Sequence, residues 1–389
     1  MTAIISESPP ALAPTARERP RGREQQAIRD LLQRAEGGAG GVVLVDGEPG
    51  IGRSRLLHAA VDEAAGRGFS LVSGAADQLG QAIGCCPLSA ALGGPSGGLH
   101  LRARLERRAA AAPVLVALDD LQFASPATLA ALRTLPRELR EHPVAWLLAR
   151  CTTCPRVAVR LFGLLEQDGA ARLTLAALDA ATVTSMLAGA FGAPPDPGLA
   201  SLAEGAGGNP ALLTELIGGL SDERLVRVSN GQAGLTTSRL PQRVDRLARR
   251  RLDALGRQAR HLLVTAAVLG PVFRLEDAAE MLGDTPAALL PAVEEAMDAA
   301  IITAADSTFA FRHQLLRRAA GETIPRPARQ ALHRQFAEIL LARGESASRA
   351  AGHLLQAAHP AEHPAEHPAE YADRRSLAGL DQAAARRSS

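Results

Sequence analysis

The residues of this chain that are best suited to chemistry form a glycine-rich octapeptide, GEPGIGRS, at residues 47–54. Its three glycines permit backbone angles that other residues avoid, so the loop can turn its amides toward phosphate oxygens. The spacing fits the pattern G-x-x-x-x-G-K-[ST], whose final hydroxyl, here Ser54, binds a magnesium ion. The residues predicted to contact a nucleotide are Gly47, Glu48, Pro49, Gly50, Ile51, Gly52, Arg53, Ser54 and Arg55.

Two acidic residues, Asp119 and Asp120, end a second apolar run, PVLVALDD, at residues 113–120. In proteins with a phosphate-binding loop, the first such acid holds Mg²⁺, usually through water. Asp119 and Ser54 are therefore the predicted magnesium ligands. Asp120 is the candidate general base, or the group that positions the attacking water. A turn or helix-capping role is the alternative for this pair.

Arg53 stands where the loop pattern has lysine. A lysine ammonium is a compact charge that fits between the β- and γ-phosphates, whereas a guanidinium is wider and planar. None of the 43 basic residues is a lysine, so Arg53 need not mark a specific decay of the site. We predict nucleotide binding with slow or absent hydrolysis, and leave open whether the chain is a weak ATPase.

Short apolar runs must position these residues at one edge of a sheet. The candidate buried strands cover residues 41–46, 69–73, 113–120, 144–149 and 173–175, with helical patterns between them. Strands that alternate with helices indicate a parallel sheet with helices on both faces. We therefore predict an α/β P-loop NTPase fold of the additional-strand class. The loop follows the first strand and opens a helix, which is the context that its motif requires.

The pattern becomes helical after about residue 178, and it predicts a chain of several domains. Helical stripes followed by two apolar runs, at 301–303 and 309–311, indicate a winged-helix unit. HPAE occurs three times in the tail, where proline at every fourth residue forbids a regular helix. The predicted divisions are a disordered N-terminus 1–20, a P-loop nucleotide-binding domain 21–178, a helical lid 179–238, a winged-helix domain 239–312, a helical extension 313–358 and a low-complexity tail 359–389.

Composition narrows the classes of function. The net charge is +2, so the whole chain lacks the strongly basic balance of a nucleic-acid-binding protein. We expect a soluble, cytoplasmic protein without a signal peptide or a membrane span, because the longest apolar stretch, 261–273, is too short to cross a bilayer. The four cysteines (Cys85, Cys86, Cys151 and Cys154) contain one CxxC, but no second one completes a zinc site.

With these motifs in place, the chain from about Gly22 to His353 resembles the ATP-binding module of the large LuxR-family transcriptional regulators of actinobacteria. That module is an AAA-like member of the signal-transduction ATPases with numerous domains, or STAND proteins. The segments that carry the resemblance are GRE at 22–24, GEPGIGRSRLL at 47–57, LDDLQFAS at 118–125, GNP at 208–210, AAVLG at 266–270 and FRHQLLRRA at 311–319.

The resemblance implies ATP or ADP with Mg²⁺ as cofactors, and it implies roles for three further residues. Arg150 would sense the γ-phosphate, Pro210 would pack near the adenine, and His313 would contact the β-phosphate of ADP. A helix N-cap or a core position is the alternative for His313. The chain departs from the family at Gln122 and Phe123, where the family has His-Trp, and residues 377–387 are too few for its helix-turn-helix.

We therefore expect a nucleotide-dependent switch in transcriptional control that acts through a protein partner or through self-association. Direct sequence-specific DNA binding is not expected without the helix-turn-helix. Two alternatives stay open at this point. One is a degenerate scaffold that binds nucleotide poorly, and the other is a stand-alone ATPase that remodels a partner.

Overall fold

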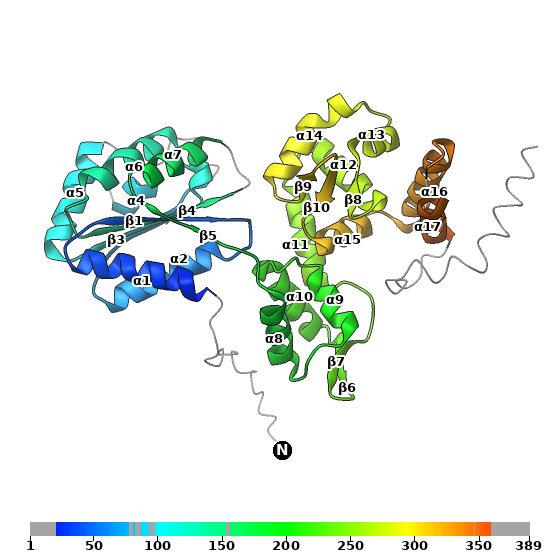
Figure 1. Cartoon of the computed structure of the whole chain (residues 1–389), viewed down its shortest axis with the longest axis horizontal. Coiled ribbons are helices and arrows are strands. Elements are labelled where there is room, and N and C mark those ends of the chain that lie inside the picture. The colour runs from blue at the N-terminus through cyan, green and yellow to red at the C-terminus, as the bar shows by residue number, and fades with distance from the viewer. Residues whose placement is uncertain are drawn as a thin grey trace, which may run out of the picture.

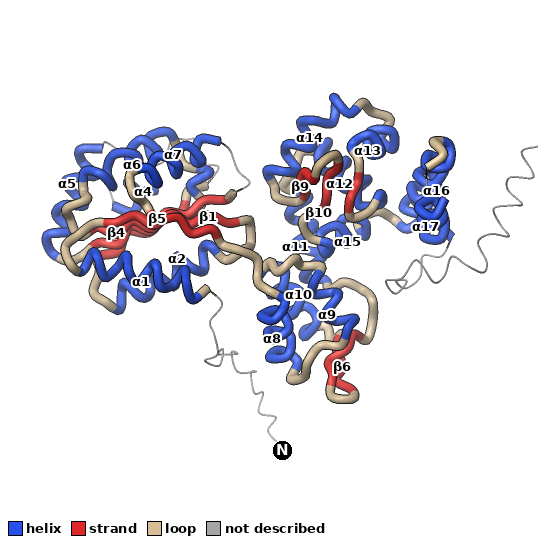
Figure 2. The backbone as a smooth tube through the Cα atoms, in the orientation of Figure 1, coloured by secondary structure: helices blue, strands red, loops and turns tan. Residues whose placement is uncertain are grey.

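The computed structural model describes residues 21–77, 81, 87–92, 98–152, 156–345 and 347–358. Within this part of the chain, a five-stranded sheet domain is followed by two smaller, largely helical units and a final pair of helices (Figure 1; Figure 2). The predictions for the N-terminus 1–20, for Cys85, Cys86 and Cys154, and for the HPAE tail fall outside the described residues. No described helix has the length and apolar character needed to span a membrane.

The large sheet has the strand order β2-β3-β4-β1-β5, and every pair of neighbours is parallel. Strand β4 lies between β1 and β3, which is the inserted strand that defines the additional-strand class. The predicted P-loop NTPase fold is therefore confirmed. The strands are β1 (Gly41–Gly47), β2 (Ser70–Ala75), β3 (Val114–Asp119), β4 (Val144–Cys151) and β5 (Ala171–Thr174).

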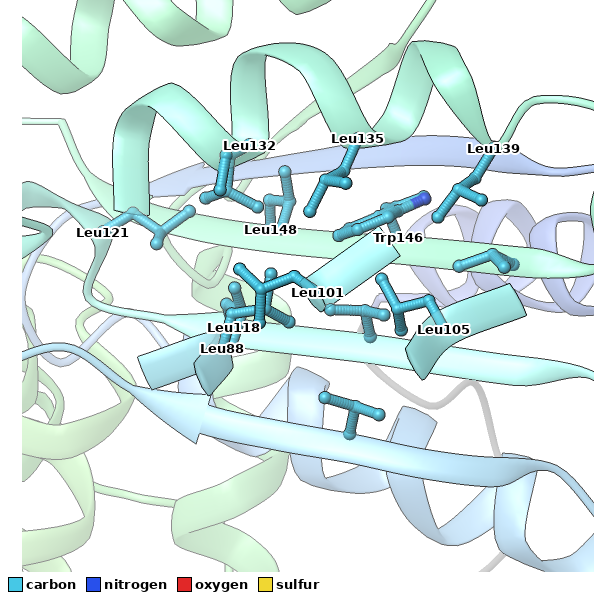
Figure 3. Packing of buried hydrophobic residues seen from close by; sticks show 14 of the residues in the cluster. Leu88, Leu101, Leu105, Leu118, Leu121, Leu132, Leu135, Leu139, Trp146 and Leu148 are labelled. Atoms are coloured by element: carbon cyan, nitrogen blue, oxygen red, sulfur yellow. The ribbon is translucent and has the colours of Figure 1, made fainter. Parts of the chain in front are cut away.

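Helices cover both faces of this sheet, and the core consists of two layers of aliphatic side chains. The first face carries α1 (Gly22–Glu36) and α2 (Arg53–Gly66). The second carries α4 (Pro87–Leu92), α5 (Gly98–Ala111), α6 (Pro126–Glu138) and α7 (Arg156–Gln167), with Trp146 among their leucines (Figure 3). Every residue of β3 and β4 is buried, which explains why these strands read as unbroken apolar runs.

The second unit contains three helices, each of which begins after a residue that favours the N-cap position. They are α8 (Ala180–Phe191), α9 (Pro197–Glu204) and α10 (Pro210–Asp222). Asp179, Asp196 and Asn209 cap them by accepting hydrogen bonds from backbone amides of the first turn. Proline at the first position of α9 and α10 loses no hydrogen bond there.

A hairpin that the sequence analysis missed follows α10. It pairs β6 (Val226–Ser229) with β7 (Gln232–Leu235) around Asn230-Gly231. Both turn residues have positive φ, at 52° and 75°. Asn-Gly between two short strands is a strong hairpin signal, so the sequence did contain the necessary information.

The third unit combines helices with a small antiparallel sheet of order β8-β10-β9. The two apolar runs near residue 305 form β9 and β10, as predicted, whereas β8 was not predicted. Its elements are α11 (Gln242–Asp253), α12 (Arg257–Leu269), β8 (Val272–Phe273), α13 (Leu275–Leu282), α14 (Pro286–Asp298), β9 (Ile302–Ala305), β10 (Thr308–Phe311) and α15 (Gln314–Glu322).

Helices α11 and α15 join the second unit to the third. Val244 and Ala248 of α11 pack into the core of α8–α10, together with Leu315 of α15. Leu252 of α11 and Ala320 of α15 belong instead to the core of α12–α14. Because two helices contribute to both cores, we infer that the second and third units move as one body.

The last two helices, α16 (Arg326–Ala342) and α17 (Ala347–Ala358), pack against each other through a pair of buried histidines. The Nδ1 atoms of His333 and His353 lie 2.9 Å apart, and Phe336 meets the ring of His353 edge-on. One ring must donate and the other accept, so at least one of the two imidazoles is neutral. Burial lowers the pKa of each histidine to about 4, with smaller contributions from Arg329, Arg317 and Arg349.

We predict that this histidine pair makes the fold acid-sensitive. Because the folded pKa lies below the ordinary value of 6.5, its contribution to stability is complete above that pH and is lost as the pH falls toward about 4. Replacing both with leucine should flatten the pH dependence of the thermal unfolding midpoint over that interval. His58→Leu, at an exposed position of α2, is the control, and an equally flat profile for it would contradict the prediction.

Gly208 should tolerate no side chain. Its φ is +66°, and an added Cβ would fall on the carbonyl oxygen of Leu178 and lie 3.0 Å from its amide nitrogen. Gly192 is a matched control, since its φ is +73° but its Cβ would meet nothing within 4 Å. Gly192→Ala should cost about 1–2 kcal/mol for the backbone alone, and Gly208→Ala about 1–3 kcal/mol more. Equal unfolding midpoints in urea would disprove the clash.

Candidate functional site

The glycine-rich loop lies between β1 and α2, at the carboxyl edge of the large sheet. Gly50 and Gly52 have φ values of 82° and 101°, in the left-handed region that favours glycine. Helix α2 starts at Arg53, and among the described residues no side chain caps its first turn. Amides at an uncapped helix start, together with the positive end of the helix dipole, form a favourable site for an anion.

The predicted magnesium ligands are brought together by the fold. The Oγ atom of Ser54 donates a hydrogen bond to Oδ2 of Asp119 over 2.5 Å. Asp119 is the last residue of β3 and is 9% exposed. Its bond with Ser54 places its carboxylate beside the start of α2. A hydroxyl and a carboxylate oxygen are of the oxygen type that Mg²⁺ prefers, so the chemistry of this pair suits the ion.

Arg53 is directed at Asp120. Its Nη2 atom lies 3.0 Å from Oδ1 of Asp120, and the arginine side chain is largely buried. Gln122 donates to the same carboxylate oxygen over 2.8 Å and accepts a bond from the amide of Cys151. The Oδ1 atom of the candidate general base therefore already has two donors. Gln122 thus links Asp120 to β4.

The structure does not bring Arg150 to the loop. Its guanidinium is buried, with Nε 2.7 Å from Oδ1 of Asp46 and the carbon atom Cζ 4.8 Å from the ring centre of Phe162. Asp46 also pairs with Arg172, whose Nη2 lies 2.5 Å from Oδ2. A role at the γ-phosphate would require Arg150 to leave this buried carboxylate. The register of β1 and β4 places Asp46 and Arg150 side by side, which sequence spacing cannot reveal.

Helix α10 contacts the loop directly through its first turn. The side-chain amide of Asn209 donates to the carbonyl oxygen of Pro49 over 3.0 Å, and the amide of Ala211 donates to that of Gly50 over 3.1 Å. Pro210 lies between these two donors. A Cβ on Gly50 would come within 2.8 Å of Oδ1 of Asn209, so a glycine is required here by close approach as well as by backbone angle.

Arg312, at the end of β10, forms an ion pair with Glu48 of the loop. No role for Arg312, Asn209 or Ala211 could be predicted from the sequence. Each lies more than 150 residues from the loop in sequence, so no local pattern could have connected them with it. Arg21 adds a contact from the other end of the chain, since its Nη2 donates to the carbonyl oxygens of Ile51 and Ala176.

His313 lines a cavity of about 520 Å³ between the carboxyl edge of the sheet and β10. Burial, followed by the nearby charges of Arg251 and Arg312, lowers the pKa of His313 to about 4, so its ring is neutral at neutral pH. The fold thus brings His313 to the loop, whereas Ser54 and Asp119 are not among the residues that line the cavity. The lining residues are Gly47, Glu48, Ile51, Thr152, Thr174, Leu175, Ala176, Ala177, Gly207, Asn209, Thr303, Phe311, Arg312 and His313.

One known protein family matches the part of the chain that forms most of the sheet domain. Residues 19–147 match the AAA ATPase domain family. No curated protein sequence matches the chain. The part of the chain that carries the loop, both acids and strands β1 to β3 is therefore an AAA-type P-loop ATPase domain.

The chain is similar to several solved structures at low sequence identity. A Walker-type ATPase of Pyrococcus abyssi is 15% identical, with a TM-score of 0.52 over 77% of this chain and 95% of that one. The ORC2 protein of Aeropyrum pernix, in ADPNP and ADP complexes, is 15% identical, with a TM-score of 0.46 over 79% and 95%. A STAND protein with a tetratricopeptide repeat sensor from Pyrococcus horikoshii is 14% identical, with a TM-score of 0.33 over 85% and 48%.

We predict that Asn209 stabilises the chain by more than an ordinary helix cap. Asn209→Ala removes the cap of α10 and leaves the carbonyl of Pro49 without its donor, at a cost of about 2 kcal/mol or more. Asp179→Ala removes only the cap of α8 and should lower the stability less than Asn209→Ala does. Amide hydrogen exchange in residues 47–54 should accelerate in the first variant only. Equal exchange in both variants would show that the loop does not depend on α10.

Proposed function

We propose that this chain binds ATP or ADP, with Mg²⁺, and acts as a nucleotide-dependent signalling switch. The observation that carries the proposal is the set of contacts between the phosphate-binding loop and the distant half of the chain. Asn209 and Ala211 bind its carbonyls, and Arg312 pairs with Glu48. A ligand that changes the shape of this loop would change these contacts, and a switch requires such a difference in affinity between two states.

The bound state would use the loop amides, the start of α2 and the Ser54–Asp119 pair for phosphates and Mg²⁺. Pro210 and His313 are proposed to face the nucleotide from the second and third units. Both follow from the family resemblance, and both lie on segments that adjoin the loop. Arg150 is the weakest of the predicted residues, because Asp46 and Phe162 already hold its guanidinium.

Hydrolysis is proposed to be slow. A general base must accept a proton from water, but Oδ1 of Asp120 accepts from both Arg53 and Gln122. Arg53 is also turned toward that acid, which is a different use of its charge from that of a lysine between two phosphates. Retention of the nucleotide, rather than rapid turnover, suits a switch.

We further propose that residues 239–312 form a winged-helix domain of a regulator similar to the LuxR-family ATPases. Helices α12, α13 and α14, followed by the hairpin β9–β10, support this assignment. In such units the helix before the hairpin would enter a DNA groove. Here that helix, α14, carries Glu294, Glu295 and Asp298 and no arginine. The output is therefore proposed to pass through a protein partner or self-association rather than through DNA.

The test is titration of the full chain with a fluorescent ATP analogue, with and without Mg²⁺, alongside the variant Arg53→Lys. We expect both proteins to bind, binding to strengthen with Mg²⁺, and phosphate release by the native chain to be slow. No binding by either protein would refute the switch and favour a scaffold. Rapid phosphate release by the native chain would favour an ATPase that remodels a partner.

A further inference from the structure

Arg251, at the C-terminal end of α11, is a charged side chain that the site described above does not use. Among the described residues, no carboxylate pairs with its guanidinium. The Nη2 atom lies 3.3 Å from the position that a Cβ on Gly50 would occupy, so the group rests against the tip of the phosphate-binding loop. Burial lowers the pKa of Arg251, and its charge contributes to the lowered pKa of His313.

The charges around Arg251 leave this end of the loop positive. Arg312 is also there, and the one loop carboxylate, Glu48, is engaged by it. The pKa of His313 is lowered to about 4, so its ring adds no positive charge here at neutral pH. A partly buried cation without a counterion is costly in a folded protein, and such a group calls for an anion.

Other arginines on α11 differ from Arg251 in their surroundings. Arg249 pairs with Asp245, and Arg250 is exposed to solvent. Helix α11 therefore places Arg251 against the loop, while its neighbour Arg250 points to solvent. This contrast separates a role at the loop from the general basic character of the helix.

We propose that Arg251 binds the phosphates of the nucleotide, and that α11 thereby detects whether a polyphosphate is present. The inference rests on the proposed nucleotide binding and adds the residue by which the third unit recognises the ligand. A guanidinium offers a planar set of donors that matches phosphate oxygens. Because α11 contributes to both C-terminal cores, a contact at Arg251 would transmit to both units.

The experiment measures the affinity of the full chain for a fluorescent ADP and its displacement by unlabelled ADP and AMP. Arg251→Gln should weaken ADP by at least about tenfold, as expected for a lost hydrogen bond to a charged group, and should weaken AMP less. Arg251→Met, which keeps the apolar stem, should behave in the same way. Arg250→Gln is the matched control and should bind ADP as the native chain does.

The outcomes separate this inference from the proposed function. If the native chain binds ADP but both Arg251 variants match Arg250→Gln, the inference is wrong and the proposed function stands. Equal weakening of ADP and AMP would show that Arg251 supports the fold of the site without reading phosphates. If the native chain binds no ADP, the proposed function itself fails. Thermal unfolding of each variant confirms that the affinities refer to folded protein.

Discussion

The close approach of a helix end to the glycine-rich loop is the constraint on which the rest of the structure depends. At Gly50 the backbone has a positive φ, and the first turn of α10 occupies the space that a side chain would need. Two loop carbonyls thereby gain donors from residues 209 and 211. The same loop must leave its amides free for an anion. One short segment thus has the carbonyls of Pro49 and Gly50 bound by the C-terminal half, and we propose that amides at the start of α2 bind the ligand.

The sheet makes this arrangement possible because its central strands are buried on both faces. Parallel strands end at one edge, so the loop after β1, the acids after β3 and Thr152 after β4 meet there. Helices on both faces exclude water from the strands and leave this edge as the accessible side. The second and third units then cover that edge, and the cavity at His313 lies between them and the sheet.

Arginine is the cation in each of the ion pairs around this site, and the planar shape of its guanidinium group determines how it binds carboxylates. Arg53 reaches Asp120, Arg150 and Arg172 share Asp46, and Arg312 reaches Glu48. A guanidinium can pair with a carboxylate through two nitrogens, whereas an ammonium acts as a point charge. In a chain without lysine, Asp46, Glu48 and Asp120 are consequently each held in an ion pair with arginine.

The sequence by itself determined the fold class, the strands of the sheet and the position of the glycine-rich loop between a strand and a helix. These features depend on local turns, caps and apolar runs, whose physics acts over a few residues. Only the tertiary structure decided that Arg150 faces Asp46 and that Asn209, Arg251 and Arg312 meet the loop. These contacts join segments more than a hundred residues apart, and their formation depends on strand register and on the packing of α10, α11 and β10.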